Sequence, residues 1–312
     1  MLPRAMLRDF LGTDRPLRVV VNPSAGRGRA RRRGDELVRA LAQSDLPHER
    51  FDTNGRGDAE RFAATATGPI VVVGGDGTVS EVLNGLPCRD GRCGPIAVLP
   101  SGSGDDFASS AGFATAPAEL VERLRHGTLR AVDCGDAVMA TTTGDVTRRF
   151  ANELGVGFEA DVIRATAGLP LRGRALYLMA TLRALGRRRP FAAEIERDGA
   201  AAAARSLLLA SFCNTRRVGG GLPLVPHARL DDGRLDLIEV DALTRLGTLV
   251  LLAKLVRKKH LGDPRVRTAA VTAAVVRADP PVAVVCDGEI VEGVRELRVR
   301  VAAGAVLLCG AS

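Results

Sequence analysis

The chain has 312 residues, an apolar fraction of 46% and a formal net charge of +8. This length predicts two domains with ordinary hydrophobic cores, and no run of about 20 uncharged apolar residues is present that could cross a membrane. Its only lysines are Lys254, Lys258 and Lys259, which excludes a lysine-dependent phosphate loop and a protein-kinase strand lysine from the first 253 residues.

Composition also limits the kinds of partner that the chain is expected to bind. Aromatic residues make up 3% of the chain, with one Tyr and no Trp, so stacking platforms for single-stranded nucleic acid are not expected. We therefore predict that the chain has no nucleic-acid partner and that its positive charge favours binding of an anion of another kind. The six cysteines are scattered and predict reduced thiols. Arg4, Arg8 and Asp9 interrupt the apolar N-terminus and argue against a signal peptide, so a cytoplasmic location is expected.

The first 135 residues alternate between strand-like and helix-like segments. Buried strands are predicted at 17–22, 70–73 and 96–100, and helices at 29–42, at 78–86 and from about residue 106. Apolar strands on both sides of helices are typical of a parallel sheet covered on both faces. We expect residues 1–135 to form an α/β nucleotide-binding domain with a parallel sheet.

The pattern changes after Val132. Short strand-like segments follow closely on one another and predict a second, mainly antiparallel β domain over 136–312. Helices are predicted at 172–188 and 243–260, and residues 198–206 read as a hairpin tip. We leave open that the last strand or the C-terminal tail packs back on the first domain.

Three polar loops follow predicted parallel strands: "NPSAGRG" (22–28), "GGDGT" (74–78) and "PSGSGDDF" (100–107). Loops at the carboxyl ends of parallel strands line one crevice, where ligands bind. One such loop is usually only a turn, whereas three in one domain favour a binding site. Thr78 and Glu81 predict a capping box, which would place a helix N-terminus, suited to phosphate, at the glycines. Asp76 is the natural carboxylate for a magnesium–nucleotide complex.

Together these loops resemble the catalytic domain of the diacylglycerol kinase family, which includes sphingosine, ceramide and bacterial lipid kinases. NAD kinases are more distant relatives with a similar GGDG loop. The segments "FANELGVGFEADVI" (150–163), "NTRRVGGGLPLVPHARLDDGRLDL" (214–237) and "CDGE" (286–289) follow in the order and spacing of the bacterial members. The resemblance covers about residues 17–310 and implies transfer of the γ-phosphate of ATP, with Mg²⁺, to a lipid alcohol, foremost diacylglycerol.

The resemblance also implies roles for individual residues. Glu289 would accept the hydroxyl proton, with Asp287 and Asp76 as the other catalytic acids. Asp232, with the backbone carbonyls of Arg229 and Arg234, would bind a structural magnesium. ATP would contact Asn22, Pro23, Ser24, Ala25, Gly26, Thr53, Gly74, Gly75, Asp76, Gly77, Thr78, Val79, Ser80 and Ser103.

Some residues depart from the family pattern. Ser80 stands where Asn is usual, Ser103 replaces Thr, and Asp105 replaces Asn, which adds a charge beside the expected phosphates. From the residues alone, Asp287 and Glu289 read equally well as a tight Asp-Gly turn with an exposed glutamate. The alternatives therefore stay open: a sphingoid-base or other lipid kinase, an NAD kinase-like enzyme, or a nucleotide or lipid binder without turnover.

Two predicted helices end in cations, within "RALGRRRPF" (183–191) and "KLVRKKH" (254–260). Such ends suit an anionic lipid surface and equally suit helix C-termini that face water. With a lipid alcohol as substrate, we expect peripheral membrane association, and a homodimer is left open. The arginines of "RGRARRRG" (27–34) are predicted to be a solvated helix start rather than ATP ligands.

Overall fold

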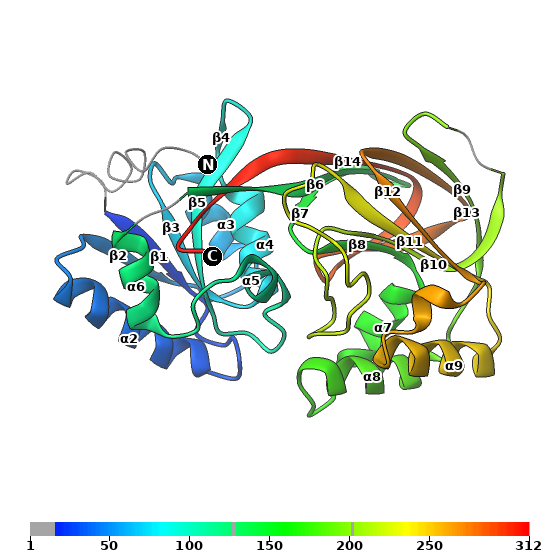
Figure 1. Cartoon of the computed structure of the whole chain (residues 1–312), viewed down its shortest axis with the longest axis horizontal. Coiled ribbons are helices and arrows are strands. Elements are labelled where there is room, and N and C mark those ends of the chain that lie inside the picture. The colour runs from blue at the N-terminus through cyan, green and yellow to red at the C-terminus, as the bar shows by residue number, and fades with distance from the viewer. Residues whose placement is uncertain (1–15, 127–128, 201–202, 312) are drawn as a thin grey trace. The chain divides into compact units, whose positions relative to one another are not determined.

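The computed structural model describes residues 16–126, 129–200 and 203–311. The charged N-terminal segment lies outside the described residues. The chain divides into two compact units, one within Met1–Asp133 and Gly304–Ser312 and the other at Cys134–Ala303. The sequence places the boundary at residue 135. Strands β6 (Leu129–Thr141) and β14 (Glu289–Cys309) run through both units (Figure 1).

The first unit alternates strands and helices along the chain. After β1 and α2 come two further strand–helix pairs, then a short hairpin and two helices. The elements are β1 (Leu17–Val21), α2 (Arg29–Gln43), β2 (His48–Asp52), α3 (Asp58–Ala64), β3 (Ile70–Gly74), α4 (Asp76–Gly85), β4 (Cys88–Arg89), β5 (Arg92–Pro100), α5 (Asp106–Ala111) and α6 (Pro117–Arg125).

The sheet of this unit is mixed. β1 pairs in parallel with β2 and β3, β3 with β5, and β5 with the end of β14. β4 pairs antiparallel with β5, so the sheet is not the wholly parallel one that the sequence predicts. The strands carry runs of buried β-branched residues, such as Val71–Val73, which suit a sheet covered on both faces.

The second unit is rich in strands and carries three α-helices among its described residues. Its elements after β6 are β7 (Gly144–Phe150), β8 (Glu153–Gly157), α7 (Phe158–Thr166), α8 (Gly173–Ala184), β9 (Phe191–Arg197), β10 (Arg205–Cys213), β11 (Leu235–Asp241), α9 (Arg245–Val256), the 3-10 turn His260–Gly262, β12 (Val266–Val271) and β13 (Ala273–Cys286). The second β-rich domain and both of the helices predicted there are confirmed.

Strand pairing in the second unit is antiparallel, in the order β12–β11–β10–β8–β13–β14. Successive residues face opposite sides of the sheet. Ala210 and Phe212 of β10 belong to a core between strands, whereas Leu209 and Cys213 pack in a second core with α7 and α8. Helices α7, α8 and α9 thus cover one face of this sheet (Figure 1).

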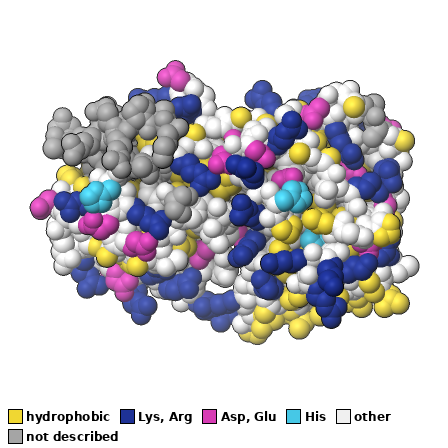
Figure 2. All heavy atoms as spheres, in the orientation of Figure 1, with side chains coloured by type: hydrophobic (Ala, Val, Ile, Leu, Met, Phe, Trp, Pro, Cys, Tyr) yellow, Lys and Arg dark blue, Asp and Glu magenta, His cyan; other side chains and the backbone are white. Residues whose placement is uncertain are grey.

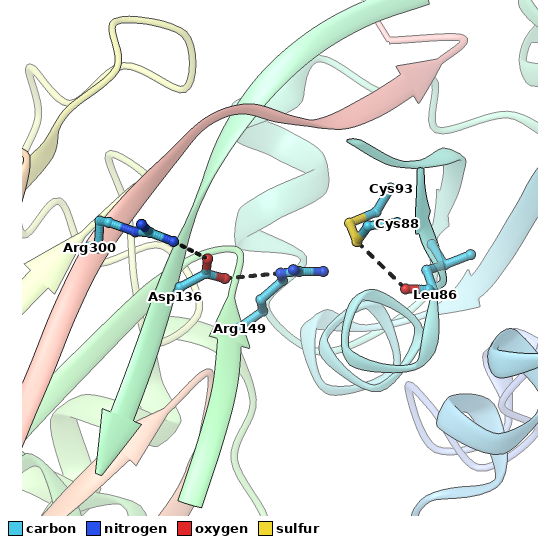
Figure 3. The surroundings of a disulfide bond; sticks show 6 residues. All are labelled: Leu86, Cys88, Cys93, Asp136, Arg149 and Arg300. Carbon is cyan, nitrogen blue, oxygen red and sulfur yellow. Dashed lines mark hydrogen bonds and ion pairs between the residues drawn. A yellow bond between two sulfur atoms is a disulfide. The ribbon is translucent and has the colours of Figure 1, made fainter. Parts of the chain in front are cut away.

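A disulfide corrects the expectation of reduced thiols. Cys88 and Cys93 are bonded to each other across the β4–β5 hairpin (Figure 3). The two-residue turn Asp90–Gly91, with positive φ at both positions, sets a register in which the two cysteines lie directly opposite each other. The other four cysteines are buried and form no disulfide.

Figure 3 also shows an ion-pair cluster of the second unit. Asp136 of β6 contacts Arg149 of β7 at 2.9 Å and Arg300 of β14 at 3.8 Å. Among the residues that the structure describes, no helix is long and apolar enough to cross a membrane.

Candidate active site

Three loops meet at the carboxyl ends of β1, β3 and β5. The backbone N–H of Asn22 donates to the Val73 carbonyl at 3.0 Å, and the N–H of Ser101 donates to the Gly74 carbonyl at 2.8 Å. The side chain of Asn22 donates to Thr78 Oγ1 at 3.1 Å and accepts from Ser24. The predicted convergence of segments 22–28, 74–78 and 100–107 is therefore present.

Close main-chain contacts explain three glycines of these loops, Gly26, Gly75 and Gly102. A Cβ at Gly75 would lie 2.9 Å from the Cα of Gly102, and a Cβ at Gly26 would lie 2.4 Å from the Ser101 carbonyl oxygen. Gly77 differs, because a Cβ there would meet nothing within 4 Å. Gly77 is exposed, it lies in the first turn of α4, and its φ is not positive. Neither packing nor backbone conformation requires a glycine at this position.

The predicted capping box is wrong. Helix α4 begins at Asp76, two residues before Thr78, and its N-cap residue is Gly75. Thr78 accepts from Asn22, while Glu81 Oε2 accepts the backbone N–H of Ala59 in the first turn of α3 at 3.2 Å. Thr78 and Glu81 therefore join α4 to neighbouring segments, and the N-terminus of α4 lies closer to the glycines than the sequence predicts.

Asp76 has a structural role that the sequence did not reveal. Its two carboxylate oxygens accept the backbone N–H groups of Asp106 and Phe107, at 3.1 and 3.0 Å, in the first turn of α5. A carboxylate offers about four acceptor positions, so these bonds are compatible with metal binding. Asp76 thus ties the second loop to the third.

Two arginines hold the third loop, and this corrects the prediction of a solvated helix start. Arg29 donates to the Gly102 carbonyl at 2.5 Å, and Arg33 donates to the Pro100 carbonyl at 2.8 Å. Arg29 also lies 3.5 Å from Asp105. Burial raises the pKa of Asp105 to about 6, against a backbone hydrogen bond from Gly102 that lowers it. The charge that distinguishes this loop from the family pattern therefore lies beside a cation.

The other predicted ATP contacts are unevenly exposed. Ser24 and Ser103 are exposed in the first and third loops, and Pro23, Ala25 and Gly26 are half-buried. Thr53, Thr78, Val79 and Ser80 are buried.

The second unit carries the acidic motif in a tight hairpin turn. Asp287 and Gly288 connect β13 to β14, with φ of 45° and 88°, as in the two-residue turns of β-hairpins. The Asp287 carboxylate accepts three backbone N–H bonds, from Ala151 at 2.7 Å, Asn152 at 2.9 Å and Glu153 at 3.1 Å. Asp287 therefore anchors the 151–153 loop.

Glu289 lies in a different environment from Asp287. Its side chain is about one third exposed, and Oε2 lies 3.7 Å from Nε of Arg148 on β7. A partly exposed carboxylate can accept a proton from a hydroxyl group. Of the two acids in the motif, Glu289 is the more exposed, whereas Asp287 is buried and holds three backbone N–H groups.

An apolar cavity of about 140 Å³ lies in the same unit, between the sheet and helices α7, α8 and α9. Its lining is almost entirely hydrocarbon, with Glu153 and Glu159 among the lining residues. Burial raises the pKa of Glu159 to about 7, while a hydrogen bond with Glu153 opposes this shift and the charge of Asp287 adds to it. Glu153 lines this cavity and also belongs to the 151–153 loop that Asp287 holds, so the loop forms part of the cavity wall.

The predicted magnesium loop is an exposed turn. Asp232 Oδ1 accepts the backbone N–H of Arg234 at 3.1 Å. One carboxylate and two backbone carbonyls, of Arg229 and Arg234, are the oxygen ligands that Mg²⁺ prefers. In the described part of the chain, no three His, Cys, Asp or Glu side chains converge to hold a metal ion, so a magnesium here would need main-chain and water oxygens.

Sequence reasoning missed several residues of these sites. Asp106 is a buried carboxyl group at the start of α5 and donates its N–H to Asp76. Arg29 and Arg33 were assigned to solvent, and Glu159 was not singled out. A spacing of four between Arg29 and Arg33 places both on one helix face, a signal that could have indicated a shared contact.

Comparisons with known proteins cover nearly the whole chain. Residues 16–137 match the diacylglycerol kinase catalytic domain, and residues 152–310 match the YegS C-terminal NAD kinase beta sandwich-like domain. A diacylglycerol kinase of Mycobacterium tuberculosis is 28% identical over 86% of this chain and 87% of its own length. A YegS-like lipid kinase of Xanthomonas euvesicatoria is 30% identical over 64% of this chain and 67% of its own length.

Solved structures show the same fold. Those of a diacylglycerol kinase from Bacillus anthracis match with TM-scores of 0.65 to 0.75, at 21–23% identity, over 94% of this chain and 96% of theirs. A yeast NADH kinase in complex with NADH matches with a TM-score of 0.57, at 11% identity, over 96% of this chain and 85% of its own.

Proposed function

Since this chain belongs to the diacylglycerol kinase family of lipid kinases, we propose that it transfers the γ-phosphate of ATP to the hydroxyl of a lipid alcohol, foremost diacylglycerol. The observation that carries this proposal is that one chain holds the features needed for both substrates. The first unit has glycine-rich loops at the ends of three strands. The second unit has the partly exposed Glu289 and an apolar cavity.

ATP is proposed to bind at the three loops of the first unit. The N-terminus of α4 offers backbone N–H groups and a positive dipole end to phosphate oxygens, and Gly77 lets them approach the main chain. Arg29 and Arg33, which hold the third loop, would add cationic charge near the phosphates in the absence of a phosphate-loop lysine. Asp76 would hold Mg²⁺ with the triphosphate, where the ion would neutralise charge on the phosphate oxygens.

Glu289 is proposed to accept the proton of the attacking hydroxyl. The oxygen–hydrogen bond of the lipid alcohol breaks as its oxygen attacks the γ-phosphorus, the proton goes to Glu289, and ADP leaves. Asp287 is a positioning residue in this assignment, because its carboxylate is bonded to the 151–153 loop. Glu289 belongs to the second unit, and the nucleotide loops belong to the first.

The cavity favours a hydrocarbon substrate over a soluble one. Its lining is apolar and comes from the second unit, and a cavity of this size accepts a short length of hydrocarbon. NAD has no comparable apolar segment. The NAD kinase-like alternative, which rests on the shared fold, is therefore less favoured, and sphingoid bases and other lipid alcohols remain the competing substrates.

One assay tests this function. Purified protein is incubated with γ-labelled ATP, Mg²⁺ and detergent micelles that carry diacylglycerol, a sphingoid base or ceramide, with NAD as the soluble comparison. We expect label in a lipid product, strongest with diacylglycerol, and none in NAD. Label in NAD alone, or in no acceptor while ATP binds, would contradict the proposal.

A further inference from the structure

The exposed large hydrophobic side chains of the described residues all belong to α8 and α9. Leu246 is the most exposed of them, at 71%. Figure 2 shows hydrophobic side chains gathered along the edge of the second unit where Figure 1 places these helices. The set comprises Met179, Leu182, Leu246, Leu249, Val250 and Val256. A concentration of this kind marks an interaction surface.

Helix α9 is apolar on both sides. Leu251, Leu252 and Leu255 line the cavity, whereas Leu246 and Val250 face away into solvent, and Thr248 is the only buried residue of the helix. A helix that is apolar all round is normally buried in protein or in lipid. Twelve residues span about 18 Å, which is too short for a bilayer core of about 30 Å. Such a helix suits the plane of a membrane interface.

The charge around these helices has a single sign. Residues 168–190 and 242–262 contain no Asp or Glu. Lys254 pairs with Asp263 at 2.8 Å, but in the described part of the chain no ion pair is found for the exposed Arg257, Lys258 or Lys259. Lys258 has a φ of 58° at the end of α9, a position where glycine is usual. A lysine in that conformation places one more cation beside the apolar face.

We propose that the outer faces of α8 and α9, with the cations that follow each helix, form a docking face for an anionic lipid bilayer. This inference rests on the proposed function, because a lipid alcohol substrate resides in a bilayer. The inner faces of the same helices line the apolar cavity, through Tyr177 and Thr181 of α8 and the leucines of α9. Docking through these helices would bring the cavity wall against the lipid that holds the substrate.

Charge decides between a bilayer and a second copy of this chain. A symmetric dimer through this face would set the same surface against itself and would bring cations opposite cations, because residues 168–190 and 242–262 contain no acid. An anionic lipid surface instead attracts each nearby cation, and it accepts the apolar side chains between them. The lipid surface satisfies both features of the face.

Vesicle binding tests the docking face. Co-sedimentation is measured with phosphatidylcholine vesicles, with and without one third phosphatidylglycerol. The double variant Lys258→Gln/Lys259→Gln should bind the anionic vesicles about 30-fold more weakly, and Leu246→Gln/Val250→Gln about tenfold more weakly. The control Arg31→Gln/Arg39→Gln removes two exposed cations from α2 and should bind as the wild type does. Equal binding by both test variants and the wild type would overturn the proposal.

The three lysines give a second readout. Because the chain has lysines only at positions 254, 258 and 259, an amine-reactive acetylating reagent reports side-chain lysine exposure from α9 and its C-terminal end alone. Anionic vesicles should lower acetylation of Lys258 and Lys259 at least fivefold, and neutral vesicles should not. Unchanged acetylation while the protein co-sediments would show that another face binds, and would overturn the proposal.

Activity on a short-chain diacylglycerol, dispersed as monomers in water, separates this inference from the proposed function. The docking variants should phosphorylate it at the wild-type rate, because no bilayer is involved. A wild-type protein that phosphorylates it but ignores anionic vesicles refutes docking and leaves the kinase assignment intact. A protein that docks through Lys258 and Lys259 but phosphorylates no lipid supports docking and refutes the kinase assignment.

Discussion

Replacing Glu289 with glutamine is expected to lower the rate of phosphoryl transfer about 10³-fold, because the amide cannot accept the hydroxyl proton that general-base catalysis removes. The side chain is partly exposed and its cationic neighbour, Arg148, lies 3.7 Å away, so the fold should not depend on the charge. Steady-state kinetics with labelled ATP measure the rate, and calorimetric titration with ATP and Mg²⁺ should return the wild-type affinity.

Glu296→Gln is the matched control for this substitution. Glu296 lies on the same strand and forms ion pairs with Arg277 and Arg298, so the change removes one carboxylate from β14 without touching the turn. Its rate should stay within twofold of the wild type. Near-normal turnover by the Glu289 variant would show that another group accepts the proton.

Asp287→Asn is expected to destabilise the second unit by about 2–4 kcal/mol. The carboxylate accepts three backbone N–H bonds from Ala151, Asn152 and Glu153, whereas an amide offers one oxygen and turns an NH₂ group toward the remaining donors. Asparagine tolerates the left-handed backbone at this position, so the substitution changes the carboxylate's bonds and charge without straining the turn. Urea unfolding monitored by far-ultraviolet circular dichroism measures the difference.

Substitutions of the two acids of this motif should therefore affect different properties of the protein. Glu289→Gln should lose turnover and keep its free energy of unfolding within about 0.5 kcal/mol of the wild type, the usual range for a surface change. Asp287→Asn should lose stability, with turnover reduced through displacement of Glu289. A fully stable Asp287 variant that has lost turnover would instead assign Asp287 a direct chemical role.

Sequence patterns were sufficient for the buried strands β1, β3 and β5 and for the convergence of the loops, but β2 was not predicted. A run of four β-branched apolar residues, such as Ile70–Val73, predicts a buried strand. Loops that follow parallel strands must emerge at one edge of the sheet. The antiparallel pairing of β4 was not predicted, because a two-residue strand carries no periodicity.

Side-chain partners were the weaker part of the sequence-based prediction. The spacing of Thr78 and Glu81 fits a capping box, but both side chains bond to segments more than 20 residues away, Asn22 and Ala59. Asp76 and Asp287 were predicted as catalytic acids from motifs, and their bonds to α5 and to the 151–153 loop depend on tertiary contacts. A motif identifies which residues matter, and it does not distinguish anchoring from chemistry.

The glycine loop illustrates the same limit. The stretch Gly74–Gly77 predicts a close approach of something to the backbone, and the structure divides that prediction between two causes. Gly75 is required by the neighbouring main chain of Gly102, while Gly77 opens onto unoccupied space within 4 Å of its missing Cβ. Gly77 is therefore the glycine of this stretch that packing does not explain, and we attribute it to the proposed approach of the ATP phosphates.

Titration of Gly77→Ala with ATP and Mg²⁺ tests the central claim most directly. Alanine suits a helix by about 1 kcal/mol more than glycine, so the variant should fold at least as stably as the wild type. Gly262→Ala, at another uncrowded glycine, is the control and should bind ATP normally. We predict at least a tenfold loss of affinity at Gly77. Affinity within twofold of the wild type, in a folded Gly77 variant, would contradict the placing of the triphosphate against this turn.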